Sequence, residues 1–375
     1  GRLAMEKVSY VPVDSVKIEP PAATPLPAST KTTDLSTLTG NYTAQNLETL
    51  TGTLGGNYKI SIADGAVVFL KDVTIDGTNS KSRKWAGINC PGNATLVLEG
   101  NNTVKGFYEN YPGIHIPEGK TLTIKGTGSL TASSTGYGAG IGGGYEISCG
   151  NIVIEGGTIT AKGGYNAAGI GGGEYGSCGN IVIKGGTITA TGGSRASGIG
   201  GGDEGSCGNI VIEGGTITAS GGTNGAGIGS GYKGSCGSIT ITSVDKLTVN
   251  RGGYAPSIGK GKDGTCGTVT IGETVYPDGI NVQDYTISII YSYIYGYVYG
   301  TATNTNVTIP SNKYSLLSVS RTGDNLQFQV DGGEAKTLPV NKLKNLAPFS
   351  VGGADGITEA QAFKGNLAEV RVWTT

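Results

Sequence analysis

Short segments in which β-branched and small residues alternate fill the middle of the chain. Within residues 139–229 each group contains GIG, then NIVI, then TIT, and glycines separate the three segments. Alternation with period two over so few residues is typical of strands and not of helices. We therefore expect three short strands, bounded by glycine-rich corners, in every copy of this pattern.

The same pattern returns every 29 residues, marked by Cys149, Cys178, Cys207 and Cys236. A fixed period of this length is the signature of a solenoid, in which each coil buries its apolar side chains only against its neighbours. Three strands per coil predict an all-β fold, a right-handed parallel β-helix of about seven or eight coils over residues 41–276. Equivalent residues then stack about 4.8 Å apart along the axis.

This stacking predicts ladders of equivalent residues along the axis. We expect one apolar column to point inward, one amide column to bond its neighbours and the turn backbone, and one outward column to alternate in charge so that neighbours attract. These columns are the isoleucines (Ile152, Ile181, Ile210, Ile239), the asparagines (Asn151, Asn180, Asn209) and the charged residues (Glu155, Lys184, Glu213).

The two flanks differ from the repeats. Residues 1–40 contain one strand-like segment, Val11–Pro20, followed by a Pro-rich linker, Pro20–Thr33. Residues 277–375 contain less glycine, longer strand-like segments and turn signals such as Asp331-Gly-Gly. An antiparallel β-sandwich is the natural prediction for this C-terminal part.

Two family resemblances follow from these segments. AGINCPGNATLVLEGNNTVKG and the repeated AGIGGG and CGNIVIEGGTITA resemble the glycine-rich coils of large bacterial surface proteins of the adhesin-like or carbohydrate-binding type. LLSVSRTGDNLQFQVDGG and the closing FKGNLAEVRVW resemble the laminin-G/concanavalin-like lectin sandwich. The resemblances imply a surface role for the coils and a lectin-like domain after them.

The cysteines form a ladder of their own. Five of the six are expected to stack in one column, whereas Cys90 lies in an earlier coil: Cys149, Cys178, Cys207, Cys236 and Cys266. A spacing of about 4.8 Å is within disulfide reach, but an odd column cannot pair completely and small thiols fill such columns well. We favour free thiols, with cross-coil disulfides as the alternative. No Cys-x-x-Cys pair is present, so we expect neither a metal site nor a cofactor.

Charge and composition exclude some partners. The formal net charge is −1, which gives no reason to expect nucleic acid or an anionic membrane as a ligand. No apolar run reaches the length of a membrane span. The chain begins Gly-Arg and not Met. We therefore expect a mature exported form, with its signal peptide removed, at the cell surface or outside the cell.

The segment IYSYIYGYVYG contains the most informative candidate binding residues. Its tyrosines alternate, so that in one continuous strand they would share a face: Tyr291, Tyr293, Tyr295, Tyr297 and Tyr299. A row of exposed tyrosines can stack on sugar rings while the hydroxyls form hydrogen bonds. The alternatives are a face that packs on the β-helix or the opposite sheet, or a hairpin at Gly296.

Charged residues also gather in the glycine-rich corner of successive coils. They are Glu146, Glu174, Asp203 and Glu204, with Lys233, Lys262 and Asp263 in later coils. Carboxylates converging from several coils would suit a polysaccharide lyase or glycoside hydrolase. Their signs and offsets vary, however, so we interpret them as solvated turn residues and predict no catalytic residue. His115, in the segment GIHIP, has no evident partner and is interpreted as structural.

The TIT segments suggest a third hypothesis for the function. Their outward threonines, such as Thr158 and Thr160, would form a flat grid. Ice binding or a purely structural stalk would follow from such a grid. The preferred hypothesis is a non-catalytic, exported bacterial adhesin. Its sandwich binds a glycan or another host-surface ligand, and its β-helix acts as a spacer. The enzyme remains the main alternative, and the sequence leaves the oligomeric state open.

Overall fold

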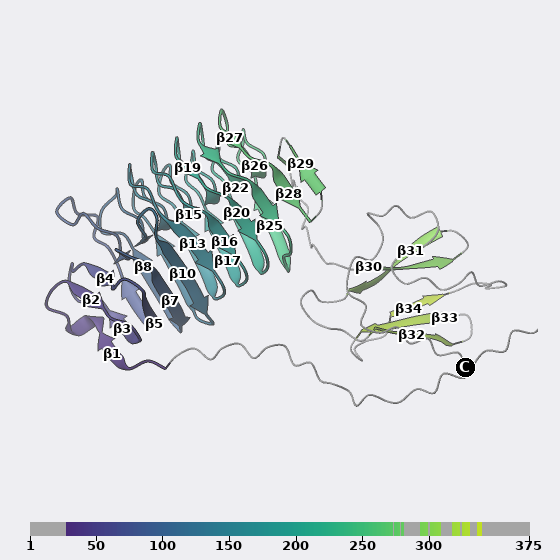
Figure 1. The fold of residues 1–375 in the computed structure, drawn as a ribbon, viewed down its shortest axis with the longest axis horizontal. Helices are drawn as coiled ribbons and strands as arrows, with labels where there is room; N and C mark the ends of the chain where they lie inside the picture. Colours follow the sequence, from purple (N-terminus) through teal and green to yellow (C-terminus); the bar gives the residue numbers. More distant parts are fainter. Residues whose placement is uncertain are drawn as a thin grey trace, which may run out of the picture.

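The structure is a computed structural model. It describes residues 28–272, 274–277, 279 and 280, and in addition the backbone of five strands between residues 293 and 339. Its main body is a parallel β-helix of about seven turns, seen in Figure 1 as a stack of coils that proceeds in sequence order. A single short 3-10 helix, η1 (Leu35–Thr37), interrupts the strands of the described residues.

Most coils contribute two consecutive strands to a 17-stranded sheet. The first strands of the coils are β3 (Glu48–Thr53), β5 (Ala66–Ile75), β7 (Ala94–Glu99), β10 (Thr121–Gly126), β13 (Asn151–Ile154), β16 (Ile181–Ile183), β20 (Ile210–Ile212), β24 (Ile239–Ile241) and β28 (Val269–Ile271). The second strands are β8 (Asn101–Lys105), β11 (Ser129–Ser133), β14 (Thr158–Lys162), β17 (Thr187–Thr191), β21 (Thr216–Ser220) and β25 (Lys246–Asn250). The long β5 pairs with both β7 and β8.

Shorter strands close the other side of each coil. A nine-stranded sheet is formed by β2 (Tyr42–Ala44), β4 (Ile60–Ile62), β6 (Ile88–Asn89), β9 (Ile114–His115), β12 (Ile141–Gly142), β15 (Ile170–Gly171), β18 (Ile199–Gly200), β22 (Ile228–Gly229) and β26 (Ile258–Gly259). The last coils add a fourth strand that the sequence did not predict, in β19 (Ser206–Cys207), β23 (Ser235–Cys236) and β27 (Thr265–Cys266).

The register confirms the predicted inward column. Ile152 pairs with Ile181, Ile181 with Ile210, and Ile210 with Ile239, and all four side chains are fully buried. Glycine makes the tight stacking of the short strands possible. Gly171 has φ +133°, and a Cβ there would collide with the carbonyl oxygen of Gly200 in the next coil. The core is therefore a set of apolar columns that run along the axis.

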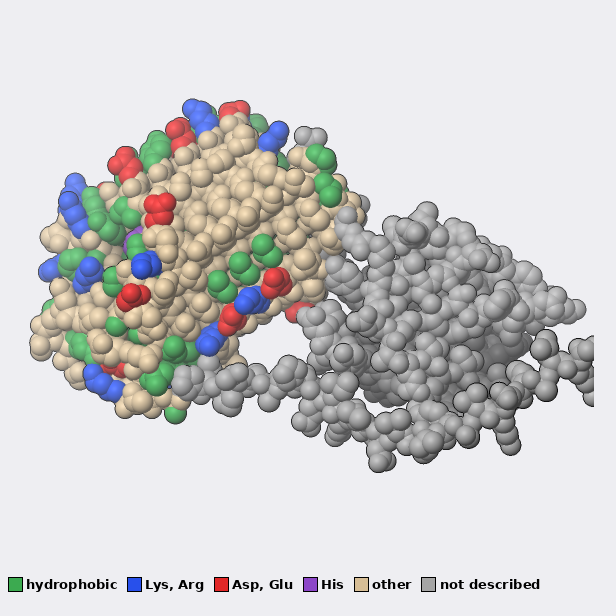
Figure 2. Space-filling view, viewed as in Figure 1, with side chains coloured by type: hydrophobic (Ala, Val, Ile, Leu, Met, Phe, Trp, Pro, Cys, Tyr) green, Lys and Arg blue, Asp and Glu red, His purple; other side chains and the backbone are tan. Residues whose placement is uncertain are grey.

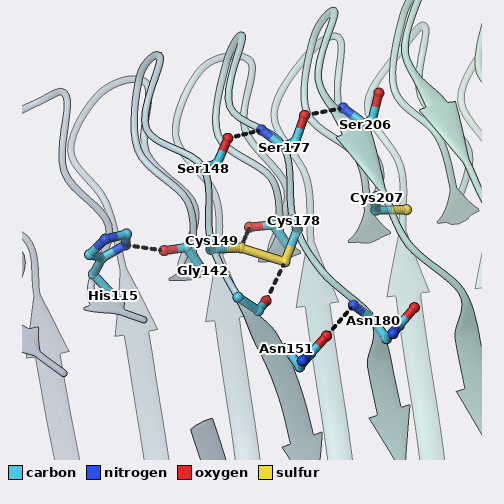
Figure 3. Close-up of a disulfide and its surroundings, with 12 residues drawn as sticks. His115, Gly142, Ser148, Cys149, Asn151, Ser177, Cys178, Asn180, Ser206 and Cys207 are labelled. Carbon is cyan, nitrogen blue, oxygen red and sulfur yellow. Dashed lines mark hydrogen bonds between the residues drawn. A yellow bond between two sulfur atoms is a disulfide. The ribbon is translucent and has the colours of Figure 1, made fainter. Parts of the chain in front are cut away.

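Polar ladders run along the outside of the coils. Asn151 Oδ1 accepts the N–H of Asn180 at 2.9 Å, as Figure 3 shows. Asn180 Oδ1 accepts the N–H of Asn209 at 2.8 Å, so each amide bonds the backbone of the next coil. In the charged column Lys184 Nζ lies 3.1 Å from Glu155 Oε1. Figure 2 shows alternating acidic and basic side chains in one stripe across several coils. Such exposed pairs contribute little each.

The cysteine ladder differs from the preferred free-thiol interpretation. Cys149 is bonded to Cys178, as Figure 3 shows, and Cys236 is bonded to Cys266. The Cα atoms of these pairs are 4.5 and 4.6 Å apart, within the range that a disulfide spans. Cys207 lies between the two bonds as a buried free thiol, and Cys90 is the other buried free thiol. The odd member of the ladder is thus its central one.

The N-terminal end of the β-helix begins earlier than predicted. β1 (Lys31–Asp34) pairs in parallel with β3, so the stack starts at Lys31 and not near Asn41. η1 follows at once, with the Asp34 carboxylate accepting the N–H of Ser36 at 2.9 Å. Leu35 is fully buried, and it closes the first coil.

At the other end, β29 (Thr274–Tyr276) turns back and pairs antiparallel with β28. Beyond it the backbone forms two antiparallel groups, β30 (Tyr293–Val298) with β31 (Thr301–Thr308), and β32 (Leu317–Thr322), β33 (Asn325–Val330) and β34 (Lys336–Pro339). Apart from these five strands, residues 281–375 lie outside the described residues, and the sandwich stays a prediction. Within the described residues, no helix has the length and apolar character needed to cross a bilayer.

Candidate functional site

Five consecutive loops between the shortest strands and the cysteine ladder form one edge of the stack, which we call the loop ridge. Each loop has two variable positions, occupied in turn by Tyr145–Glu146, Glu174–Tyr175, Asp203–Glu204, Tyr232–Lys233 and Lys262–Asp263. Figure 2 shows acidic, basic and hydrophobic side chains interspersed along this edge, above a broad uncharged face. The loop ridge therefore gathers most of the chemically distinctive side chains of the repeats.

The second position of every ridge loop has a left-handed backbone. The φ angles are 54° at Glu146, 56° at Tyr175 and 51° at Glu204, a region that residues with a Cβ rarely occupy. Hydrogen bonds between coils compensate for this strain. The N–H of Glu146 bonds the carbonyl of Glu174 at 2.9 Å, and the N–H of Tyr175 bonds the carbonyl of Asp203 at 2.8 Å. The same geometry recurs in each loop, so the ridge is a regular frame for variable side chains.

Four tyrosines form a contiguous group, the tyrosine cluster, at the N-terminal half of the ridge. The ring centroids of Tyr137 and Tyr145 are 5.7 Å apart, those of Tyr137 and Tyr165 are 5.8 Å apart, and those of Tyr145 and Tyr175 are 5.6 Å apart. Tyr165 and Tyr175 are 68% and 44% exposed. These distances are typical of favourable aromatic pairs, so the exposed rings are held in place by the half-buried ones.

Two carboxyl groups lie beneath the ridge surface. Asp203 is fully buried and Glu174 is 7% exposed, so neither is the solvated turn residue that the sequence suggested. Burial raises the pKa of both carboxyl groups, and Arg195 opposes that rise in the pKa of Asp203 through an ion pair of 3.2 Å. Among the residues that the structure describes, one oxygen of each, Glu174 Oε2 and Asp203 Oδ1, finds no hydrogen-bond partner. Both residues occupy the first position of their ridge loops, whereas Tyr145, Tyr232 and Lys262 at the same position are only half-buried.

The C-terminal half of the ridge is a cationic group around one ring. Arg195, Lys233 and Lys262 lie 5.1, 5.2 and 5.3 Å from the centroid of Tyr232, within cation–π range. Each cation also has an acidic neighbour. Lys233 lies 3.6 Å from Glu204, and Lys262 lies 2.7 Å from Asp263. Each of these three cations is therefore matched by a carboxylate.

An open depression of about 300 Å³ lies at the N-terminal end of the ridge. Three coils contribute its lining: Lys84, Tyr108, Asn110, Tyr111, Tyr145, Glu146 and Ile147. Tyr145 belongs to both the depression and the tyrosine cluster, so the two features are continuous. Among the described residues, no group of three or more His, Cys, Asp or Glu side chains is arranged to hold a metal ion.

His115 has a structural partner that the sequence could not show. Its Nδ1 lies 2.9 Å from the carbonyl oxygen of Gly142 in the next coil, as Figure 3 shows. Burial lowers the pKa of this imidazole, which favours the neutral ring. His115 therefore links two coils and lies apart from the ridge loops.

The predicted tyrosine row lies only partly within the described backbone. β30 includes Tyr293, Tyr295 and Tyr297, whereas Tyr291 and Tyr299 lie outside the described residues. β30 forms a hairpin with β31, with a register irregularity between Tyr293 and Tyr295. The side chains of the row are not described, and its role in binding stays a prediction.

The outward threonines do form stacked columns. Thr158 pairs with Thr187, and Thr160 with Thr189, and these four side chains are exposed. The grid becomes irregular after β21, where Lys246 takes the place of the threonine. Ice binding by this grid stays untested.

The tyrosine cluster was missed by reasoning from sequence alone. The sequence did show that each ridge loop carries two adjacent residues that are tyrosine or charged. The tyrosine, however, is at the first position in Tyr145 and at the second in Tyr175. That shift hides the contact between the two rings. The partners Tyr137 and Tyr165 come from a different loop of the coil, and only the fold brings them together.

Comparison with known proteins agrees with this architecture. A family model for the β-helix repeat matches residues 122–145, 152–174, 181–203 and 210–232. These four segments are β-helix repeats. Each match ends at the first position of a ridge loop, so the repeat covers the coil up to the variable pair. Searches of curated proteins and of solved structures found no match.

Proposed function

We propose that this β-helix repeat protein is a non-catalytic, exported surface protein that binds glycan through the tyrosine cluster. The main support for this proposal is the packing of four tyrosines at the ridge, two of which remain substantially exposed. Solvent-facing apolar rings that are grouped and fixed mark a binding surface more strongly than rings that are scattered. A surface or polysaccharide-interacting role is also compatible with the β-helix repeat.

The chemistry of the cluster suits sugars. A pyranose has an apolar face of C–H groups and a rim of hydroxyls, and tyrosine offers a flat apolar ring with a polar end. Because Tyr165 and Tyr175 are positioned by ring contacts with Tyr137 and Tyr145, little side-chain entropy is lost on binding. The rigid stack of coils below them would act as scaffold and spacer.

The test is a glycan and polysaccharide panel scored with the full chain. We expect binding that the double substitution Tyr165→Ala and Tyr175→Ala abolishes. Tyr254→Ala is the matched control, because Tyr254 is 69% exposed yet lies outside the cluster. No binding by the intact protein contradicts the proposal. Loss only in a Tyr291, Tyr293 and Tyr295 triple alanine variant would move the binding site to the C-terminal part.

A polysaccharide lyase or hydrolase is the second candidate, and the buried carboxyl groups are the observation in its favour. Glu174 and Asp203 occupy equivalent positions in adjacent coils, and both have a raised pKa, as a general acid requires. Asp203 is fully buried and paired with Arg195, which opposes direct contact with a substrate. Release of products from the same panel, lost in Glu174→Gln, would establish the enzyme and overturn the non-catalytic proposal.

A further inference from the structure

We propose that the depression at the N-terminal end of the ridge is a subsite for one uncharged pyranose residue of the bound glycan. This inference rests on the proposed function, and it adds the chemical class of the sugar and the residues that select it. The depression lies beside the tyrosine cluster and shares Tyr145 with it. A glycan chain stacked on Tyr175 and Tyr145 would therefore continue into this space.

The walls of the depression are held in place by backbone bonds between coils. The loop that carries Lys84 is fixed because the N–H of Phe107 bonds the carbonyl of Trp85 at 3.2 Å, and the N–H of Ser80 bonds the carbonyl of Phe107 at 2.9 Å. On the opposite side, the N–H of Tyr145 bonds the carbonyl of Asn110 at 2.8 Å. The rings of Trp85 and Phe107 also pack 5.9 Å apart. Such a site needs little reordering to bind a ligand.

The lining combines apolar rings with both kinds of hydrogen-bonding group. Tyr108, Tyr111 and Tyr145 supply ring faces and hydroxyls. The Asn110 amide can donate and accept, the Glu146 carboxylate accepts, and the Lys84 ammonium donates. Adjacent hydroxyls on a sugar ring are both donors and acceptors, so this set can satisfy them in pairs.

The charges of the lining favour a neutral sugar. Lys84 and Glu146 have opposite signs, and within the described residues neither forms an ion pair with another side chain. An acidic sugar would gain from Lys84 but would bring its carboxylate near Glu146, which is repulsive. A neutral ring can bond both groups without that cost. Burial and the neighbouring Glu146 carboxylate raise the pKa of the Tyr145 hydroxyl, so this carboxylate lies near the aromatic wall.

The experiment is calorimetric titration of the full chain with neutral hexose oligosaccharides and with oligomers of galacturonic acid. We expect the neutral probes to bind and the acidic probes to bind at least tenfold more weakly. Glu146→Gln should weaken neutral binding about tenfold, because a charge-assisted hydrogen bond is replaced by a neutral one. Glu204→Gln is the matched control, since it has the same loop position and a φ of 51° but lies outside the depression.

Tyr108→Ala provides a second variant that does not alter charge, and it too should weaken neutral binding. Thermal unfolding of each variant checks that the fold is retained. Unchanged binding in Glu146→Gln and Tyr108→Ala, with loss in the Tyr165 and Tyr175 double variant, overturns the subsite but leaves glycan binding intact. Preferential binding of the acidic oligomers, lost in Lys84→Met, overturns the neutral class. If the intact chain binds no oligosaccharide, both proposals fail.

Discussion

The coils before and after residue 139 achieve the same architecture with different side chains. The earlier coils bury a mixture of leucine, valine and isoleucine, and they contain Phe107, whose ring is 1% exposed. The later coils are filled by columns of isoleucine, alanine and cysteine in strict register, with asparagine amides bonding coil to coil. A solenoid can thus be filled by varied apolar side chains or by exact repetition. The proposed subsite lies where the two parts meet, and takes Tyr108 from one and Tyr145 from the other.

The largest expected effect concerns the bulky core of the earlier coils. Phe107→Ala should lower the free energy of unfolding by about 3–5 kcal/mol, because it removes a ring that is 1% exposed and leaves a cavity. Ile188→Val, in a regular column of the later coils, should cost only about 0.5–1.5 kcal/mol. Urea unfolding of both variants gives the comparison. A loss for Phe107→Ala as small as that for Ile188→Val would show that the ring of Phe107 does not belong to a packed core.

Both disulfides lie in the later coils, so removing one tests the stability of that part of the β-helix. Cys149→Ser should lower the free energy of unfolding by about 3.6 kcal/mol, as expected for a loop of about 30 residues. Cys90→Ser, in an earlier coil with no disulfide, is the control and should cost much less. Mass spectrometry of peptides from the unreduced protein checks the pairing directly.

The disulfide pairing also predicts how many cysteine thiols are free to react. Burial raises the pKa of Cys90 and of Cys207 to about 12, so neither thiol forms appreciable thiolate near neutral pH. Two thiols should therefore react with iodoacetamide after denaturation and none before it. Six reactive thiols after denaturation without reductant would restore the free-thiol interpretation of the ladder.

The sequence predicted the parts of the fold that depend on repetition. Ile152 and Asn151 recur at a fixed spacing, so their columns and their contacts follow from stacking alone. Contacts between unlike positions could not be predicted in this way. His115 bonds a backbone carbonyl one coil away, and Arg195 reaches Asp203 from a different loop.

The sequence also could not show which neighbouring cysteines of the ladder form disulfides. Each internal cysteine has a possible partner on either side, because the strand register places it next to both. Periodicity gives these neighbours equal spacing and does not choose between them. The burial of Glu174 and the exposure of Tyr175 were likewise undetermined, since both positions are framed by the same glycines.

The smallest expected effect is an opposite pH response of the two parts. In the first coil, burial tends to raise the pKa of Glu48, but the N–H of Gln45, the hydroxyls of Thr33 and Tyr42, and Lys31 hold it below its ordinary value of 4.5. In the later coils, burial raises the pKa of Glu174 above 4.5 and that of Asp203 above 3.8. A lowered pKa stabilises the fold above the ordinary value, and this stability is lost as the pH falls through the folded pKa.

A raised pKa acts in the opposite direction, because the folded state then keeps protons that the unfolded state has released. As the pH falls from 7 towards the ordinary carboxyl values, the later coils should gain stability. At still lower pH, as Glu48 is protonated, the first coil should lose it. Hydrogen exchange of peptides from each part, corrected for the intrinsic effect of pH, measures both responses. Asp203→Asn should reduce the gain and Glu48→Gln should remove the loss, whereas the same slope in both parts would show that these carboxyl groups do not govern it.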